Sequence, residues 1–74
     1  MNIDKALKNI ETGMMFRTRE NGDVVKVIFR DGEIKQIFIN EILVDDGSGA
    51  RGENYPEFGD SDIFADDWEV AMGF

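Results

Sequence analysis

The sequence lacks both cysteine and histidine, and each absence removes a class of chemistry. Without cysteine, the chain has no disulfide, no thiolate metal ligand and no cysteine nucleophile. Without histidine, it lacks the commonest metal ligand and the commonest general base. A serine triad is excluded for the same reason, because Ser48 and Ser61 have no imidazole to activate them.

Acidic residues are abundant instead, but their spacing builds neither a metal site nor a catalytic pair. An EF-hand calcium loop needs side-chain oxygens at its first, third and fifth positions. Counted from Asp45, the third and fifth positions are Gly47 and Gly49, which have no side chain to offer. Asp66 and Asp67 are adjacent in sequence and rarely converge on one substrate, so we expect turn and solubility roles. We predict no cofactor, no metal site and no enzymatic activity.

The chain has 74 residues, which predicts a single domain spanning residues 1–74. A domain of this size buries only about 60% of the surface that its unfolded chain exposes, so its core is thin. Small domains are usually reinforced by disulfides, a metal or self-association, and self-association is the one left here. We therefore expect a homo-oligomer, either a dimer or a tetramer.

No stretch approaches the roughly 18 consecutive apolar residues of a membrane span. The charged start, Met1-Asn2-Ile3-Asp4-Lys5, lacks the apolar core of a targeting segment. We expect a cytoplasmic protein with no membrane partner.

The net charge of −8 is concentrated at one end of the chain. Residues 1–44 carry seven acidic and seven basic residues, whereas residues 45–74 carry nine acidic residues and Arg51 alone. Direct nucleic-acid binding is disfavoured, because it requires a basic footprint. The acidic half is either a face for a partner or an ordinary solvated surface.

The first residues have the pattern of a short amphipathic helix over residues 3–12. Asn2 is a good N-cap, and Gly13 offers the left-handed conformation that ends a helix. The apolar residues of the segment share one helical face: Ile3, Ala6, Leu7 and Ile10. Such a short helix must lie on another element to be stable.

The middle of the chain predicts an antiparallel meander. Its strands are expected at residues 14–20, 24–30 and 33–39. Asn21-Gly22 and Asp31-Gly32 are strong signals for tight hairpin turns between them. The third strand can continue to Val44 across an irregularity at Asn40-Glu41.

The remaining residues lead from a loop to a closing strand. Residues 45–54 are rich in glycine and predict a loop, and residues 55–58 predict an extended return. Asp60 or Ser61 should cap a short turn before a strand over residues 67–72. One face of that strand should hold Trp68, Val70 and Met72. The pattern predicts an α+β fold, in which the N-terminal helix packs on a small antiparallel sheet with Trp68 as the core anchor beneath it.

One face of the second strand mixes apolar and basic residues. Val24 and Ile28 alternate there with Lys26 and Arg30. Such a face suits self-association, although scattered apolar residues are also ordinary on protein surfaces.

Arg17 and Arg19 alternate on the first strand and should project from one face beside the Asn21-Gly22 turn. Arginine suits the bidentate capture of phosphate. Tyr55 and Phe58 are able to stack on a nucleotide base. The alternative is that the arginines are ordinary surface charges and the aromatics form a satellite core.

The two ends of the chain resemble the Thoeris anti-defence family of phage sponge proteins. The family start, M-x-F-x-x-A-L-x-x-(I/L)-x-x-G, is matched from Ile3 to Gly13. The family end, W-x-x-S-x-x-D-(I/L/M)-x-A-(D/E)-D-W-E-V, is matched from Asp62 to Val70, but the aromatic before the final turn is Phe58 where the family has a tryptophan. The middle departs from the pattern: Thr18 stands between the two arginines, and Asn21 stands where the family has a tryptophan.

The resemblance implies a protein that sequesters a nucleotide-derived immune signal, of cyclic ADP-ribose or cyclic-oligonucleotide type, without cleaving it. Family members hold such ligands between protomers of a homo-oligomer. We therefore predict that an arginine binds phosphate, an aromatic stacks on the base and Asp62 accepts a polar contact. The predicted ligand-binding residues are Arg17, Arg19, Asn21, Tyr55, Phe58 and Asp62. The alternative is an acidic inhibitor that covers the basic nucleic-acid-binding surface of a host defence protein, such as a CRISPR nuclease.

Overall fold

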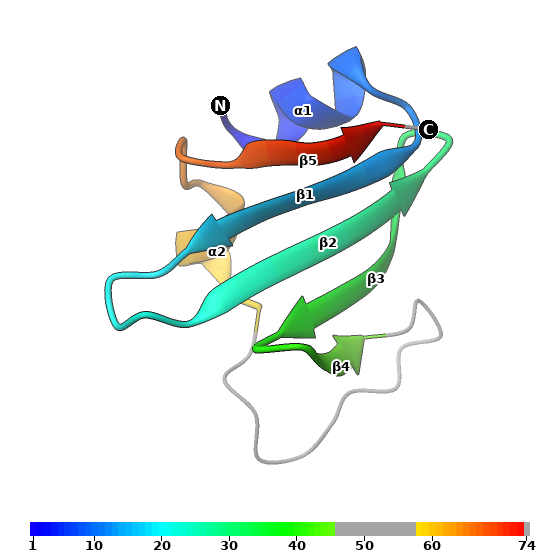
Figure 1. The fold of residues 1–74 in the computed structure, drawn as a ribbon. Helices are drawn as coiled ribbons and strands as arrows, with labels where there is room; N and C mark the ends of the chain where they lie inside the picture. The colour runs from blue at the N-terminus through cyan, green and yellow to red at the C-terminus, as the bar shows by residue number, and fades with distance from the viewer. Residues whose placement is uncertain (46–57, 74) are drawn as a thin grey trace.

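The computed structural model describes residues 1–45 and 58–73, which build an antiparallel sheet with helices on one side (Figure 1). In chain order the elements are α1 (Ile3–Asn9), β1 (Gly13–Thr18), β2 (Val24–Arg30), β3 (Glu33–Ile39), β4 (Ile42–Asp45), α2 (Asp60–Ile63) and β5 (Glu69–Gly73). The strand order across the sheet is β4-β3-β2-β1-β5, and all neighbouring strands are antiparallel. The predicted α+β class is confirmed.

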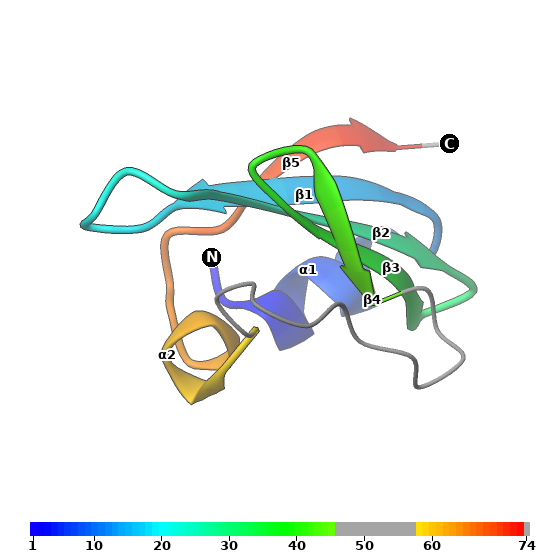
Figure 2. The same cartoon turned by 90° about the horizontal axis from the view of Figure 1, so that it is seen from below.

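Both helices lie on the same side of the sheet, and the core fills the space between them and the strands (Figure 2). The alternation of strand residues decides which side chains face this space. The buried core consists of Ile3, Ala6, Met15, Val25, Val27, Phe29, Ile37, Ile39, Val44 and Trp68. Within the described residues, no helix has the length and apolar character needed to cross a membrane.

Helix α1 begins as predicted but ends early. The side chain of Asn2 accepts a hydrogen bond from the backbone N–H of Lys5 at 2.8 Å, so the N-cap is confirmed. The helix ends at Asn9, because Ile10 already has extended backbone angles. The prediction that Gly13 closes the helix is wrong, since Gly13 is the first residue of β1. The chain enters the sheet directly, without a left-handed turn.

Two hairpin turns have paired left-handed residues. Asp31 and Gly32 have φ angles of 54° and 77°, as the predicted turn between β2 and β3 requires. Asn40 and Glu41 have φ angles of 50° and 69°. The predicted continuation of one strand across Asn40-Glu41 is therefore wrong, because the chain reverses there and β4 is a separate edge strand.

The connection between β1 and β2 is longer than the predicted two-residue turn. Strand β1 ends at Thr18, and the backbone N–H of Arg19 donates to the carbonyl of Asp23 at 2.8 Å. The N–H of Gly22 donates to the carbonyl of Arg19 at 2.9 Å, and Gly22 alone in this loop has a positive φ. The Asn21-Gly22 signal thus marks the correct hairpin but a wider loop.

Trp68 is the anchor of the core, as predicted. It is 1% exposed, and its Nε1–H donates to the main-chain carbonyl of Asp62 at 2.8 Å. The ring of Phe58 packs beside it with 6.2 Å between ring centroids. The alternation expected from Trp68 onward is interrupted after Val70, because β5 has a register shift opposite β1 before Met72.

We expect Trp68→Phe to lower the free energy of unfolding by about 1 kcal/mol or more, because the carbonyl of Asp62 loses its short hydrogen bond from Trp68 and keeps the longer one from the N–H of Ala65 at 3.3 Å. Chemical denaturation followed by circular dichroism measures the change, since this substitution removes the chain's only tryptophan. Phe64→Ala is the control, because Phe64 is 78% exposed and its removal should change little. An unchanged unfolding free energy in Trp68→Phe would contradict the role of this hydrogen bond.

Candidate functional site

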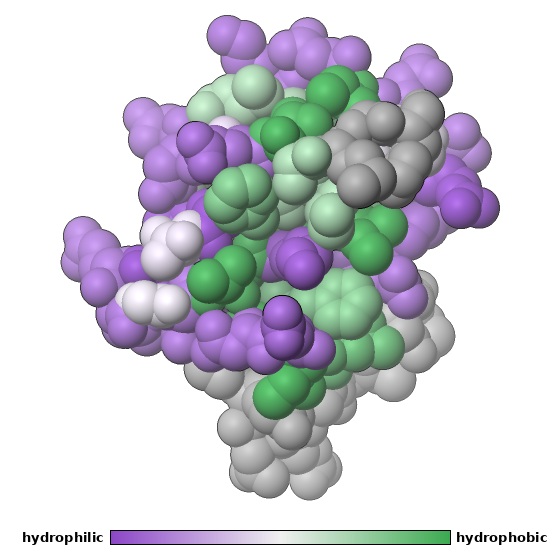
Figure 3. All heavy atoms as spheres, in the orientation of Figure 1, coloured by the Kyte–Doolittle hydropathy of each residue, from purple (hydrophilic) through white to green (hydrophobic). Residues whose placement is uncertain are grey.

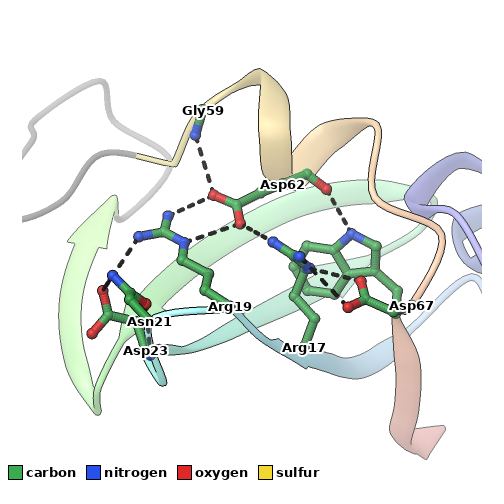
Figure 4. A network of polar contacts seen from close by, with 8 residues as sticks. Arg17, Arg19, Asn21, Asp23, Gly59, Asp62 and Asp67 are labelled. Carbon is green, nitrogen blue, oxygen red and sulfur yellow. Dashed lines mark hydrogen bonds and ion pairs between the residues drawn. The ribbon is translucent and has the colours of Figure 1, made fainter.

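The site forms where the end of β1 approaches α2. Arg17 pairs with Val25 in the sheet register, and Val25 belongs to the buried, helix-bearing side. Arg19 is two residues further along and reaches the same side. Both guanidinium groups therefore point toward α2, which contributes Asp62 (Figure 4).

Asp62 is a buried carboxylate held between the two arginines. Its residue is 0% exposed, and Arg17 Nη1 donates to Oδ1 at 2.5 Å. Arg19 Nε donates to Oδ1 at 3.1 Å, and Arg19 Nη2 donates to Oδ2 at 2.5 Å. A buried charge is tolerated only when it is paired and hydrogen-bonded, and Asp62 meets both conditions.

The short helix α2 fixes the position of Asp62. Gly59 is its N-cap, so the prediction that Asp60 or Ser61 provides the cap is wrong. The carboxylate of Asp62 reaches back to the N–H of Gly59 at 3.4 Å, and the N–H of Asp62 donates to the Gly59 carbonyl at 3.0 Å. The main chain of Asp62 also binds Trp68, so one residue joins the arginines to the core.

Two more carboxylates, Asp67 and Asp23, contact the two arginines closer to solvent. The carboxylate of Asp67 accepts two hydrogen bonds on the outer edge of the Arg17 guanidinium. The distances are 2.8 Å from Nε to Oδ1 and 3.5 Å from Nη2 to Oδ2. Asp23 lies 3.7 Å from Arg19 Nη1 and accepts hydrogen bonds from the side chains of Asn21 and Asn40. The side chain of Asp67 is 53% exposed, so its ion pair is screened by water.

These contacts shift the pKa values of the carboxyl groups. Burial raises the pKa of Asp62 and is the largest single influence, but hydrogen bonds from Arg19, Arg17 and Gly59 outweigh it and leave the pKa below its ordinary value. The hydrogen bond from Arg17 lowers the pKa of Asp67. All these groups are ionised at neutral pH, so the cluster carries both signs of charge.

A surface pocket of about 590 Å³ opens over the cluster. Its lining brings together three of the predicted ligand-binding residues, Arg17, Arg19 and Asn21. Its other lining residues are Glu20, Ser61, Ala65, Asp66 and Asp67. The acidic residues outnumber the arginines, which already bind Asp62, so the pocket has a negative balance.

The other predicted site residues do not line the pocket, and two of them make structural contacts instead. Asp62 is behind the arginines and is fully buried. Phe58 is half-buried and packs on the core beside Trp68, as the satellite-core alternative expected. Tyr55 lies outside the described residues. Sequence reasoning missed Asp67 as the partner of Arg17, although the alternating arginines and the acidic segment after α2 were the available signal.

Comparison of the chain with protein-family models, with characterised sequences and with solved structures gives no match. Among residues 1–45 and 58–73, no group of three or more acidic side chains is arranged to hold a metal ion.

We expect Asp62→Asn to lower the free energy of unfolding by about 3 kcal/mol or more, because it removes the one buried counter-charge that the two part-buried arginines share and leaves them with partners closer to solvent. Asp67→Asn is the matched control and should cost about 1 kcal/mol or less, since Asp67 is half-exposed. Urea denaturation at neutral pH measures both values. Equal effects of the two substitutions would contradict the central role of Asp62.

Acid should weaken the fold through the same group. A carboxyl whose folded pKa is lowered contributes stability above the unfolded pKa of about 3.9, and this contribution is lost as pH falls through the folded pKa. The wild-type free energy of unfolding should therefore fall below about pH 4. In Asp62→Asn the fall should be shallower, as measured by urea denaturation across pH 2–6. Parallel curves for the two proteins would contradict this assignment.

Proposed function

We propose that the protein is a non-catalytic binding protein of the cytoplasm. Its acidic end, defined as the exposed carboxylates Glu20, Asp66 and Asp67 around the pocket, docks on the basic nucleic-acid-binding surface of a partner protein. One observation carries the proposal: the arginines of the site turn inward to Asp62, whereas Glu20, Asp66 and Asp67 stay exposed around the pocket. The outward charge of this end is therefore negative.

The charge of the whole chain supports the same partner. Its net charge is −8, and the excess falls within residues 45–74. A surface with this sign attracts basic proteins and speeds their association, but it repels nucleic acid. The partner proposed is therefore a protein that itself binds nucleic acid.

The resemblance at the chain ends supports a role in countering host defence. The stretch from Asp62 to Val70 that carries the resemblance also contains the end of α2, the Trp68 anchor and the start of β5. Under this proposal a phage-type protein covers a defence nuclease, such as a CRISPR nuclease, in the host cytoplasm. Blocking the nucleic-acid channel would inhibit the nuclease without any chemical step.

The test uses a panel of basic nucleic-acid-binding proteins, including RNA-guided nucleases, immobilised for surface binding. We expect a member to bind, to be displaced by DNA and to lose affinity steeply as salt rises. The double variant Glu20→Gln/Asp66→Asn should weaken binding at least about tenfold, because even one close interfacial charge pair is worth about 1.5 kcal/mol or more.

The matched control for this test is Asp4→Asn/Glu33→Gln, which removes the same charge from exposed positions outside the pocket lining. It should leave the affinity almost unchanged. Equal losses in the two double variants, or binding that is insensitive to salt, would contradict docking through the acidic end.

A second candidate is the sequestration of a nucleotide-derived signal. The observation that favours it is the gathering of Arg17, Arg19 and Asn21 around one pocket. The outer edge of Arg17 holds only the exposed Asp67, and such a surface ion pair is worth about 1 kcal/mol or less. A ligand phosphate of suitable geometry would take this edge in place of the carboxylate.

A thermal-shift panel of cyclic ADP-ribose isomers and cyclic oligonucleotides tests the second candidate. A bound ligand should raise the melting temperature by mass action and be recovered intact after denaturation. Asp67→Asn should increase the shift, because it removes the competitor for Arg17. A flat panel at millimolar ligand would sink this candidate and leave the protein-docking proposal standing.

A further inference from the structure

The face of the sheet opposite the helices has no covering element within the described part of the chain. Helices α1 and α2 both lie on the other side (Figure 2). We call the uncovered side the open face, and its central residues are Phe16, Val24, Lys26, Ile28, Phe38 and Leu43. Figure 3 views this side and shows hydrophobic residues running across the sheet, with hydrophilic residues around them. An apolar patch of this kind marks an interaction surface.

A lysine lies at the centre of the open face with apolar neighbours on each side. Lys26 pairs in register with Phe16 on β1 and with Phe38 on β3. Along β2 it is flanked on the same face by Val24 and Ile28. Lys26 is itself half-buried, and its ammonium group has no hydrogen bond or ion pair to any residue that the structure describes. The ammonium therefore depends on water for its hydrogen bonds.

A partner that covers the open face has to replace the water around Lys26. Burying an ammonium without a counter-charge is costly, whereas a paired and hydrogen-bonded ammonium is tolerated. The covering surface is therefore apolar, to match the neighbours of Lys26, and carries one carboxylate opposite the ammonium. A second copy of this chain does not supply it, because a two-fold axis through the centre of the face sets the two Lys26 side chains against each other.

The rim of the open face is acidic on two sides of Lys26. Glu69 of β5 pairs with Phe16, so two strand spacings, about 10 Å, separate it from Lys26. Glu41, in the turn between β3 and β4, shares the lining of a pocket of about 340 Å³ with Lys26, but the two form no ion pair. Both glutamates are exposed. A complementary partner therefore has basic residues on either side of its carboxylate.

The dimensions of the centre of the face fit one α-helix. From Phe16 to Phe38 the strands β1, β2 and β3 span about 10 Å, and a helix with its side chains is about 10–12 Å wide. An amphipathic helix presents an apolar stripe in which a single position can hold a carboxylate. A sheet can also accept helices on both of its faces, and here α1 and α2 occupy only one.

We propose that the open face docks an amphipathic helix of a partner protein. The apolar stripe of this helix carries one carboxylate opposite Lys26, and its margins carry basic residues opposite Glu41 and Glu69. The contact is small and reversible, because three strands present less area than a standard interface. Lys26 selects the partner, since a helix without the carboxylate leaves the ammonium buried and unpaired. This inference does not depend on the proposed function.

Synthetic peptides of about 20 residues test the proposal, because chains of that length can form a helix in water. Their apolar stripe is leucine and their margins are lysine. The central residue of the stripe is glutamate, glutamine or lysine in three otherwise identical peptides. Each peptide is titrated into the nitrogen-15-labelled full chain, and the backbone amides are followed by NMR. The glutamate peptide should shift the amides of Phe16, Lys26 and Phe38 and bind about tenfold more tightly than the glutamine peptide, with the lysine peptide weaker still.

Charge reversal on the protein separates recognition by Lys26 from unspecific apolar binding. In Lys26→Glu the order of the peptides should reverse, so that the lysine peptide binds most tightly. Lys5→Glu is the matched control, because Lys5 is exposed on α1, on the helix-bearing side, and the wild-type order should remain. Circular dichroism should show the native fold in both variants.

Three results would overturn the proposal. Equal affinities of the three peptides, or shifts confined to residues outside the open face, would show that Lys26 does not select the ligand. The absence of any shift at about 1 mM peptide would show that this face docks no helix of the stated kind. Shifts of the open-face amides that depend on protein concentration alone would show that a second copy covers the face instead.

Discussion

The burial of one ionised carboxylate constrains the whole of this small fold. Asp62 is fully buried, so its negative charge must be paired and hydrogen-bonded by groups of the protein and not by water. Arg17 and Arg19 supply them from the end of β1, and Gly59 adds a backbone N–H. Because the carbonyl of Asp62 also accepts from Trp68, moving α2 would break the ion pairs and the core anchor together.

This constraint changes what the arginines can do. An arginine pair at a strand end resembles a phosphate site when it is considered alone. Here both guanidinium groups first neutralise Asp62, and the remaining outer edge of Arg17 lies against Asp67. The exposed charge around the pocket is therefore acidic, which favours a basic protein partner. A nucleotide ligand would have to displace Asp67 before it could use Arg17.

The fold was predictable where local chemistry decides it. The Asn2 cap, the Asp31-Gly32 turn and the period-two pattern of β2 each specify their own structure, and all are confirmed. The end of α1 and the reversal at Asn40-Glu41 were not predicted. Neither position has the expected glycine signal, because Ile10 leaves the helix in an extended conformation and Asn40 and Glu41 adopt left-handed angles without glycine.

The sequence predicts which residues lie at the candidate site better than it predicts which of them pair with one another. Arg17, Arg19 and Asn21 do line one pocket, because alternation on β1 and the following loop places them together. The pairing of the arginines with Asp62 joins positions more than forty residues apart, with separations of 45 and 43 residues. No local pattern specifies such a contact. It depends on α2 returning to the end of β1 after residues 46–57, which the structure does not describe.

The pKa of the Asp62 carboxyl group is the most direct measure of this constraint. Carbon-13 NMR of the side-chain carboxyl, followed from pH 7 to pH 2, reports it residue by residue. A buried carboxylate bound by two arginines should titrate below the ordinary aspartate pKa of about 3.9. A pKa at or above that value, in the folded protein, would show that Asp62 is not held as an ion between Arg17 and Arg19.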